Sequence, residues 1–341
     1  INNERGTDAH HVFLDHGVNG PAYFAYYDAT HPEARRFIWE KVRHGYYDHG
    51  VKLYWLDNDE PDINPWDPAN LRFHLGNGQE MANLYPLLNQ QAFYEALKAA
   101  GETEIVSLSR STWAGGQRYS SVVWSGDIAS TFEALQAQVR AGLNMAMSGY
   151  PWWTTDIGGF HGGDITRPEF RELVVRWFQY GVFCPIFRLH GYRGPSDQPI
   201  IVSGADNEVW SFGEDAYAQI TPLLFLRERL RPYIHTHMTL ASQTGLPVMR
   251  PLFVDYAQDL RCQAVEDAFL FGPDLLVAPV LGLGQRERSV YLPVGADWID
   301  VWSGACHAGG QEIQVPAPLE TIPVFARAGS GMEEIFRKES D

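Results

Sequence analysis

The stretch LYWLDNDEPDINPWD, residues 53–67, places five carboxylates within eleven positions, directly after a hydrophobic run. A metal-binding loop, a solvated turn or a strand end with one reactive acid would all fit such a cluster. Asp57 comes first, behind three large apolar side chains, so its backbone should be fixed while its carboxylate faces a cavity. Farther along the chain, Asp127 follows Trp124 in a similar way. Two carboxylates in unlike environments suit acid–base or nucleophile–acid chemistry.

The acids after Asp57 have simpler explanations. A lone aspartate at a strand end commonly caps a helix or bridges a loop, and this alternative applies to Asp57. Asn58, Asp59, Glu60 and Asp62 are expected to hydrogen-bond within the loop or to face solvent. The acids loosely resemble a calcium loop, but Pro61 and the missing Gly at the sixth position are incompatible with the tight EF-hand turn. The twelve His residues form no ligand motif, and no HExxH occurs. We therefore expect neither a metal site nor a cofactor.

Alternating helix and strand patterns form the framework for these residues. Apolar residues recur at helical spacing in four stretches, residues 33–50, 79–100, 130–141 and 168–180. Short apolar runs lie after them and close on five polar residues, Asp57, Arg110, Asp127, Asp156 and His190. Strands that alternate with helices predict a parallel sheet.

The sheet is expected to belong to a (β/α)8 (TIM) barrel. A doubly wound sheet would favour a Gly-rich phosphate loop at one switch point, and the sequence has none. Polar residues after five successive strands instead fit a barrel, in which all carboxyl ends open onto one face. Five strands do not close an eight-stranded barrel, and residues 1–32 offer at most one weak candidate more. The barrel is therefore expected to be incomplete.

The alternation of helices and strands ends at about residue 246, and short strand-like runs follow. A long helix near 214–244 precedes short strand-like runs separated by Gly and Pro, which predict a small β-sandwich. The expected organisation is a partial catalytic barrel over residues 1–245, a C-terminal β-sandwich over 246–330, and a charged tail, 331–341, outside the fold.

The charge and the aromatic content of the chain indicate which kinds of partner it could bind. The formal charge of −16 repels nucleic acid and anionic membrane surfaces, and no run of eighteen apolar residues could cross a bilayer. We expect neither kind of partner. The chain is rich in Trp, Tyr and Phe, which suits the CH faces of a neutral sugar, although large cores also use aromatics. A homo-oligomer is left open.

The cysteines and the first residues bear on the location of the protein. Three widely spaced cysteines suggest reduced thiols, which favours the cytoplasm. Residues 1–11 lack the basic and apolar regions of a signal peptide, but that observation loses weight because the chain is expected to start in mid-protein.

Four motifs carry a family resemblance: YWLDNDEP, SRSTWAGGQRYSSVVWSGD, TTDIGGF and FRLHG. In order and approximate spacing they resemble glycoside hydrolase family 31, which contains α-glucosidases, α-xylosidases and relatives. The likeness covers about residues 20–329. The family has a (β/α)8 barrel between an N-terminal β-sandwich and proximal and distal C-terminal β-domains. The resemblance implies that this chain holds barrel strands three or four to eight and the proximal domain.

The resemblance also implies roles for the strand-end residues. Asp57 matches the catalytic nucleophile, and Asp127 matches the general acid/base. Residues that match those hydrogen-bonding the sugar in the −1 subsite are Arg110, Asp156 and His190. Aromatics that match those lining this pocket are Trp55, Trp124 and Phe160. Arg110 could instead be a structural partner of the carboxylates, and Trp55 and Phe160 could belong to the core.

These roles imply a retaining mechanism, with the two carboxyl groups about 5 to 5.5 Å apart. Gln117, Arg118 and Tyr119, before the acid/base, most resemble the bacterial α-xylosidases of the family. The expected function is therefore a retaining α-glycosidase of non-reducing-end sugars, leaning to α-xylosidase. α-Glucosidase, α-galactosidase and α-transglycosylase activities would use the same catalytic residues. A different class of function is a non-catalytic carbohydrate-binding or structural remnant, because parts of the family's active site are absent.

Overall fold

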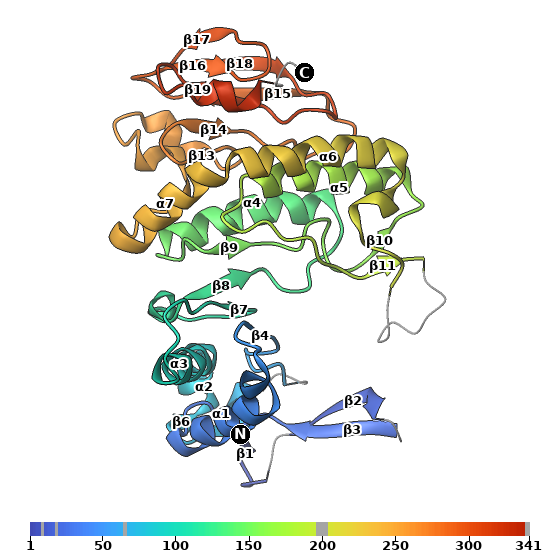
Figure 1. Cartoon of the computed structure of the whole chain (residues 1–341), viewed down its shortest axis with the longest axis vertical. Helices are drawn as coiled ribbons and strands as arrows, with labels where there is room; N and C mark the ends of the chain where they lie inside the picture. The colour runs from blue at the N-terminus through green and yellow to red at the C-terminus, as the bar shows by residue number, and fades with distance from the viewer. Residues whose placement is uncertain (8–9, 18–19, 64–66, 196–203, 338–341) are drawn as a thin grey trace. The chain divides into compact units, whose positions relative to one another are not determined.

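The computed structural model describes residues 1–341 except 8–9, 18–19, 64–66, 196–203 and 338–341 (Figure 1). The chain forms two compact units, residues 1–124 (unit 1) and 125–341 (unit 2). The helices and strands of unit 1 are β1 (Asn2–Asn3), β2 (His10–Gly17), β3 (Gly20–Ala25), α1 (Pro32–Gly45), β4 (Tyr54–Leu56), β5 (Leu71–Phe73), β6 (Gly76–Asn77), α2 (Gly78–Met81), α3 (Leu84–Ala99), β7 (Ser107–Ser109) and β8 (Ser121–Trp124).

Three strands of unit 1 form the predicted parallel ladder. β4 pairs with β7, and β7 pairs with β8, so that Leu56 lies opposite Ser109 and Ser109 opposite Val123. The residues after β4 and β7 therefore emerge at the same edge. The weak barrel-strand candidate in residues 1–32 is wrong, because β2 and β3 pair with each other as an antiparallel hairpin.

The helices before β4 and β7 begin and end at recognisable signals. His31 caps α1 by accepting a hydrogen bond from the backbone N of Glu33, and Pro32 occupies the first turn. The helix ends at Gly45, before a short 3₁₀ turn, instead of continuing to residue 50 as predicted. The helix predicted at 79–100 is likewise divided into α2 and α3.

Unit 2 contains the remaining elements. In chain order they are α4 (Phe132–Met147), β9 (Trp153–Thr154), β10 (Gly163–Asp164), α5 (Pro168–Val182), β11 (Arg193–Gly194), α6 (Glu214–Arg229), α7 (Arg231–Thr244), β12 (Met249–Arg250), β13 (Phe269–Phe271), β14 (Leu275–Val277), β15 (Glu287–Leu292), β16 (Asp297–Asp300), β17 (Cys306–Ala308), β18 (Gln311–Pro316) and β19 (Val324–Arg327). The single helix predicted near 214–244 is two helices, and Pro232 lies at the start of the second. A proline there lacks an N–H and crowds the carbonyl four residues earlier, which favours a break.

The predicted C-terminal β-sandwich is confirmed. One sheet has the strand order β12-β13-β14-β19-β16-β17, and β15 pairs with β18 in a second. Alternate side chains of β13 enter two cores: Phe269 and Phe271 pack in the core that includes α5, whereas Leu270 packs with Val290 of β15. β13 is therefore buried on both faces of the larger sheet.

The charged tail does not begin outside the fold. Residues Met332–Phe336 form a 3₁₀ helix, and both end residues are buried in the core of unit 2. The Phe336 ring stacks on Phe183 and meets Trp302 edge to face. The expectation that the residues after 330 lie outside the fold is therefore wrong for this helix. Burial of Met332 and Phe336 is enough to hold a short helix with charged neighbours against the core.

Candidate functional site

Asp57 and Arg110 meet at the carboxyl ends of β4 and β7. The backbone N of Arg110 donates to the carbonyl of Leu56 at 3.1 Å, which fixes the two strand ends together. The Arg110 Nη1 lies 3.4 Å from Asp57 Oδ1, and the Asp57 side chain is 47% exposed. The acid is thus held beside a cation while it stays open to a ligand.

Arg110 has further carboxylate partners. Its Nε and Nη2 donate to the two carboxylate oxygens of Glu60 at 2.9 and 2.8 Å, and Nη2 also reaches Asp62 at 3.1 Å. Burial disfavours the charged guanidinium, but the hydrogen bonds and charge of Glu60 and the charge of Asp57 outweigh it and raise the pKa of Arg110. Glu60 and Asp62, expected as simple loop residues, therefore help to hold the cation beside Asp57.

The Asp59 carboxylate behaves differently from its neighbours. Asp59 is only 2% exposed, and its oxygens contact Ser109 Oγ at 2.6 Å and the backbone N of Ser111 at 3.1 Å. The expectation that Asp59 stays within its loop or faces solvent is wrong. Its partners lie about fifty positions away, a distance over which local sequence pattern carries no signal.

Trp55 and Trp124 form an edge-to-face pair with ring centroids 5.6 Å apart. Trp124 is buried, whereas Trp55 is 46% exposed. Trp55 is therefore not a core residue. Together the two rings make an aromatic surface whose outer member is accessible to a ligand.

In unit 2, the loop after Asp127 is tied to the loop that carries Phe160. The carbonyl of Ile128 accepts from the backbone N of Phe160 at 2.7 Å and of His161 at 3.0 Å, and Ser130 N donates to His161 O at 2.7 Å. Asp127 itself is exposed. The backbone therefore places an accessible carboxyl and an aromatic ring on two joined loops.

Phe160 and His190 also come together in unit 2, which contains Asp156 as well. Asp156 is buried and forms an ion pair with Arg188. The rings of Phe160 and His190 lie 5.5 Å apart. The FRLHG stretch, predicted as a strand, is reduced to a parallel bridge between Ile157 and Leu189.

Arg193 joins these loops and was missed by the sequence predictions. Its buried guanidinium donates to the carbonyls of Gly159 at 2.7 Å, Ile157 at 2.9 Å and His190 at 3.2 Å. Burial lowers the pKa of Arg193 to about 10, while the charge of Asp156 acts in the opposite direction. Nothing in the local pattern distinguishes Arg193 from a surface arginine, because its partners are three backbone carbonyls and the side chain of Asn207, fourteen positions away.

Gly159 supplies a prediction about this loop junction. Its φ is +75°, and a Cβ there would lie 2.6 Å from both Ala129 O and Ser130 Cα. Gly162 has a similar φ of +85°, but a Cβ there would meet nothing within 4 Å. Gly162→Ala should cost only the left-handed backbone penalty of about 1–2 kcal/mol. Gly159→Ala should cost more and also lower kcat/KM, because the loops carrying Asp127 and Phe160 must separate.

Urea unfolding and steady-state kinetics of the two variants would check this. If Gly159→Ala lost no more stability and no more activity than Gly162→Ala, the close approach of Gly159 to the neighbouring loop would have no role.

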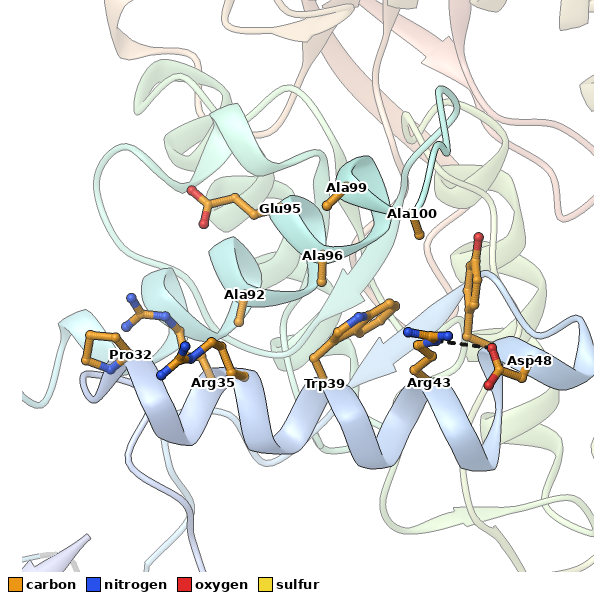
Figure 2. A pocket seen from close by; sticks show the side chains of 12 residues that line it. Pro32, Arg35, Trp39, Arg43, Asp48, Ala92, Glu95, Ala96, Ala99 and Ala100 are labelled. Atoms are coloured by element: carbon orange, nitrogen blue, oxygen red, sulfur yellow. Dashed lines mark hydrogen bonds and ion pairs between the residues drawn. The ribbon is translucent and has the colours of Figure 1, made fainter.

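A groove of about 850 Å³ lies between α1 and α3 (Figure 2). Its lining residues lie between Pro32 and Asp48 and between Ala92 and Ala100. Trp39 points from α1 toward Ala96 of α3. Arg43 pairs with Asp48 at 3.4 Å, and Arg36 pairs with Glu33 at 3.1 Å. None of the predicted site residues lines the groove, so it does not form part of the candidate site.

Among the described residues, no group of three or more His, Cys, Asp or Glu could hold a metal ion. No described helix is both long and apolar enough to span a bilayer.

Both parts of the chain resemble known proteins. Residues 2–237 match the profile of the glycosyl hydrolases family 31 TIM-barrel domain, and residues 245–331 match that of the glycosyl hydrolase family 31 C-terminal domain. An α-xylosidase from Saccharolobus solfataricus is 37% identical over 305 residues, 87% of this chain and 40% of that protein.

Solved structures agree with these matches. A GH31 α-xylosidase from a soil metagenome, complexed with xylose, has 51% identity and a TM-score of 0.89, with 96% of this chain and 50% of that chain covered. A xylosidase from Aspergillus niger has 35% identity and a TM-score of 0.84, with 94% and 50% covered. This chain thus spans half or less of the length of these relatives. It belongs to glycoside hydrolase family 31.

Proposed function

We propose that the protein carrying this chain is a retaining α-glycosidase that removes α-linked sugars from non-reducing ends, with α-xylosidase as the favoured activity. The observation that carries the proposal is the half-exposed Asp57 carboxylate, held at a strand end against Arg110. The activity named for the relatives above supports the choice of sugar. Residues 1–245 would form part of the catalytic barrel, 246–330 the proximal β-domain and 331–341 a tail beyond the family pattern.

The proposed reaction has two displacements. An Asp57 oxygen attacks the anomeric carbon while the bond to the leaving oxygen breaks, and Asp127 gives that oxygen its proton. In the second step Asp127 takes a proton from water, the water oxygen attacks the anomeric carbon, and the Asp57 ester bond breaks. Two inversions retain the α configuration. The separation of about 5 to 5.5 Å between the two carboxyl groups stays a prediction.

The remaining site residues are proposed to bind the sugar. Arg110, Asp156 and His190 would hydrogen-bond its hydroxyls in the −1 subsite. Trp55, Trp124 and Phe160 would line the pocket, where aromatic rings pack against CH groups. The partner is therefore a neutral oligosaccharide or glycoside, and no cofactor is invoked. The same residues would serve α-glucosidase, α-galactosidase or α-transglycosylase chemistry.

The sugar preference can be tested with aryl α-xyloside and aryl α-glucoside. The glucoside differs by a hydroxymethyl group at C5, and a pocket shaped for xylose should reject it by about tenfold or more in kcat/KM. An equal or reversed preference would remove the α-xylosidase assignment but leave the glycosidase assignment standing.

A non-catalytic carbohydrate-binding or structural remnant is the second candidate. The chain matches 40% to 50% of the length of the relatives described above, so its turnover is measured separately from its folding. The chain expressed alone would be tested for folding by urea unfolding and for turnover of both aryl glycosides. A folded chain without turnover supports the remnant, whereas recovery of turnover on adding the N-terminal part of a relative supports the enzyme.

A further inference from the structure

The Arg193 guanidinium contacts two loops of unit 2 that carry proposed sugar-binding residues. The loop after β9 carries Phe160, and the loop after α5 carries His190. Arg193 is 0% exposed. Its Nη1 donates to the Gly159 carbonyl, and its Nη2 donates to the carbonyls of Ile157 and His190. One buried side chain therefore binds the backbone of both loops.

Two further contacts fix the orientation of the guanidinium. Arg193 Nε donates to the side-chain oxygen of Asn207 at 2.7 Å. The guanidinium carbon lies 5.2 Å from the centroid of the Phe170 ring, which belongs to α5. Asn207 and Phe170 belong to neither loop. Because an arginine holds its donors in one plane, contacts on three nitrogens and one face leave it little freedom to turn.

Glycines leave the space that this side chain fills. A Cβ at Gly158 would lie 2.9 Å from Arg193 Nη2, and a Cβ at Gly191 would clash with Nη1. A Cβ at Gly163 would lie 3.2 Å from Arg193 Cδ. Gly158 belongs to the TTDIGGF motif and Gly191 to the FRLHG motif. The glycines of both motifs are thus explained by the close approach of the Arg193 guanidinium.

The three carbonyl oxygens need the donors that Arg193 supplies. Each can only accept, and all three converge on one buried group. Without the guanidinium, oxygens of two loops would face each other with no hydrogen between them, which favours separation of the loops. The Tyr192 backbone N still donates to the Phe160 carbonyl at 2.9 Å. The loops are therefore expected to shift and not to unfold.

We propose that Arg193 is a positioning residue, whose guanidinium holds the backbone next to Phe160 and the backbone of His190 in a fixed arrangement. Arg193 is fully buried, so it would act through these two residues and not by touching the sugar. The role in catalysis rests on the glycosidase function proposed above, whereas the arrangement of the loops does not.

Arg176 of α5 provides a matched control for the loss of a buried guanidinium. It is 1% exposed and belongs to the same unit. Its guanidinium donates to four backbone carbonyls in the loops before β15 and between β18 and β19, those of Gln285, Ala317, Pro318 and Thr321. None of these carbonyls lies in the loops of Phe160 or His190. Arg176→Met should therefore lower stability, as Arg193→Met does, but leave the two loops in place.

The arrangement of the loops can be measured by NMR of the protein with labelled histidine rings, with the His190 signals assigned by their loss in His190→Asn. The Phe160 ring lies 5.5 Å from the His190 ring, so its ring current should displace these signals from those of an exposed histidine. We expect the displacement to shrink in Arg193→Met and to persist in Arg176→Met. Wild-type His190 signals in a folded Arg193→Met would overturn the proposal whether or not the protein is a glycosidase.

Kinetics test the role in catalysis. Arg193→Met should lower kcat/KM for aryl α-xyloside by about 10²-fold, the size of loss expected when bound groups are misplaced by about 1 Å. Arg176→Met should keep the wild-type kcat/KM at a temperature at which both variants are folded. Equal losses in the two variants would show that instability alone lowers activity. That result, or wild-type kinetics in a folded Arg193→Met, would overturn the catalytic role.

Arg193→Lys decides the question if Arg193→Met does not fold. Lysine keeps the positive charge, but its ammonium is a point donor that cannot reproduce the planar fork between the two loops and Asn207. We expect a smaller loss of kcat/KM, on the order of tenfold, and a partial change of the His190 signals. A folded Arg193→Lys with wild-type kinetics and wild-type His190 signals would overturn the proposal.

Discussion

Replacing Asp57 with Ala in the native protein is expected to lower kcat for aryl α-xyloside hydrolysis by at least about 10⁴-fold. The substitution removes the oxygen that would bond to the anomeric carbon. Folding should be little affected, because the Asp57 side chain is half exposed and Arg110 keeps its hydrogen bonds to Glu60 and Asp62. Kinetics and urea unfolding should therefore separate: activity is lost while the unfolding midpoint stays close to that of the wild type.

Restoring turnover with an external nucleophile, azide, tests whether Asp57 is the nucleophile, because the configuration of the product depends on the face that azide attacks. With Asp57→Gly and an activated α-xyloside, azide can enter the space left by the carboxylate and should give the β-xylosyl azide after one inversion. Asp67→Asn, in the same acidic stretch, is the matched control and should retain wild-type turnover. Undiminished turnover by Asp57→Ala, or an α-xylosyl azide from Asp57→Gly, would contradict the assignment.

Asp127→Ala is expected to show a loss that depends on the leaving group. A proton donor contributes about 10²–10⁴-fold when the leaving oxygen is poor, as in an oligosaccharide, and much less when an activated aryloxide departs without a proton. The second step should then become slow for the activated substrate, since no base helps water to attack. A burst of aryloxide followed by slow steady-state release would reveal this change.

The product formed with azide also tests the acid/base role of Asp127. In Asp127→Ala, azide attacks the glycosyl-enzyme from the face that water normally uses and should give the α-xylosyl azide. Asp164→Asn is a control from the same unit, because Asp164, the last residue of β10, accepts its hydrogen bonds from the nearby Thr166. Equal losses for good and poor leaving groups in Asp127→Ala would contradict the acid/base role.

The strand-end pattern made part of the fold predictable. β4 and β7 are short apolar runs followed by a polar residue, and the parallel register brings Asp57 and Arg110 to the same edge of the ladder. Periodicity also located the main helices. It did not locate their ends, because these depend on single residues: the helix predicted over 214–244 breaks where Pro232 removes a backbone donor.

The features that sequence pattern missed depend on contacts between distant residues. Asp59 has the same local surroundings as Glu60 and Asp62, yet it is buried because Ser109 and Ser111, some fifty positions away, contact its carboxyl group. The Arg193 guanidinium similarly donates to three backbone carbonyls on two loops, 157–159 and the loop of His190. Periodicity records which faces of an element are apolar, and a buried polar contact between loops leaves no periodic trace.

The central claim is that Asp57 forms the covalent bond to the sugar, and the most direct test is to trap that bond. A ring-fluorinated α-xylosyl fluoride would be added to the native protein. Its ring fluorine slows both formation and hydrolysis of the glycosyl-enzyme, whereas the good fluoride leaving group speeds formation alone, so the glycosyl-enzyme accumulates. Proteolysis and mass spectrometry would then locate the label. The expected result is one fluoroxylosyl group on the peptide containing Asp57, fragmented to that residue, and no label on Asp57→Asn. A label on another carboxylate, or continued turnover with no covalent adduct, would contradict the account.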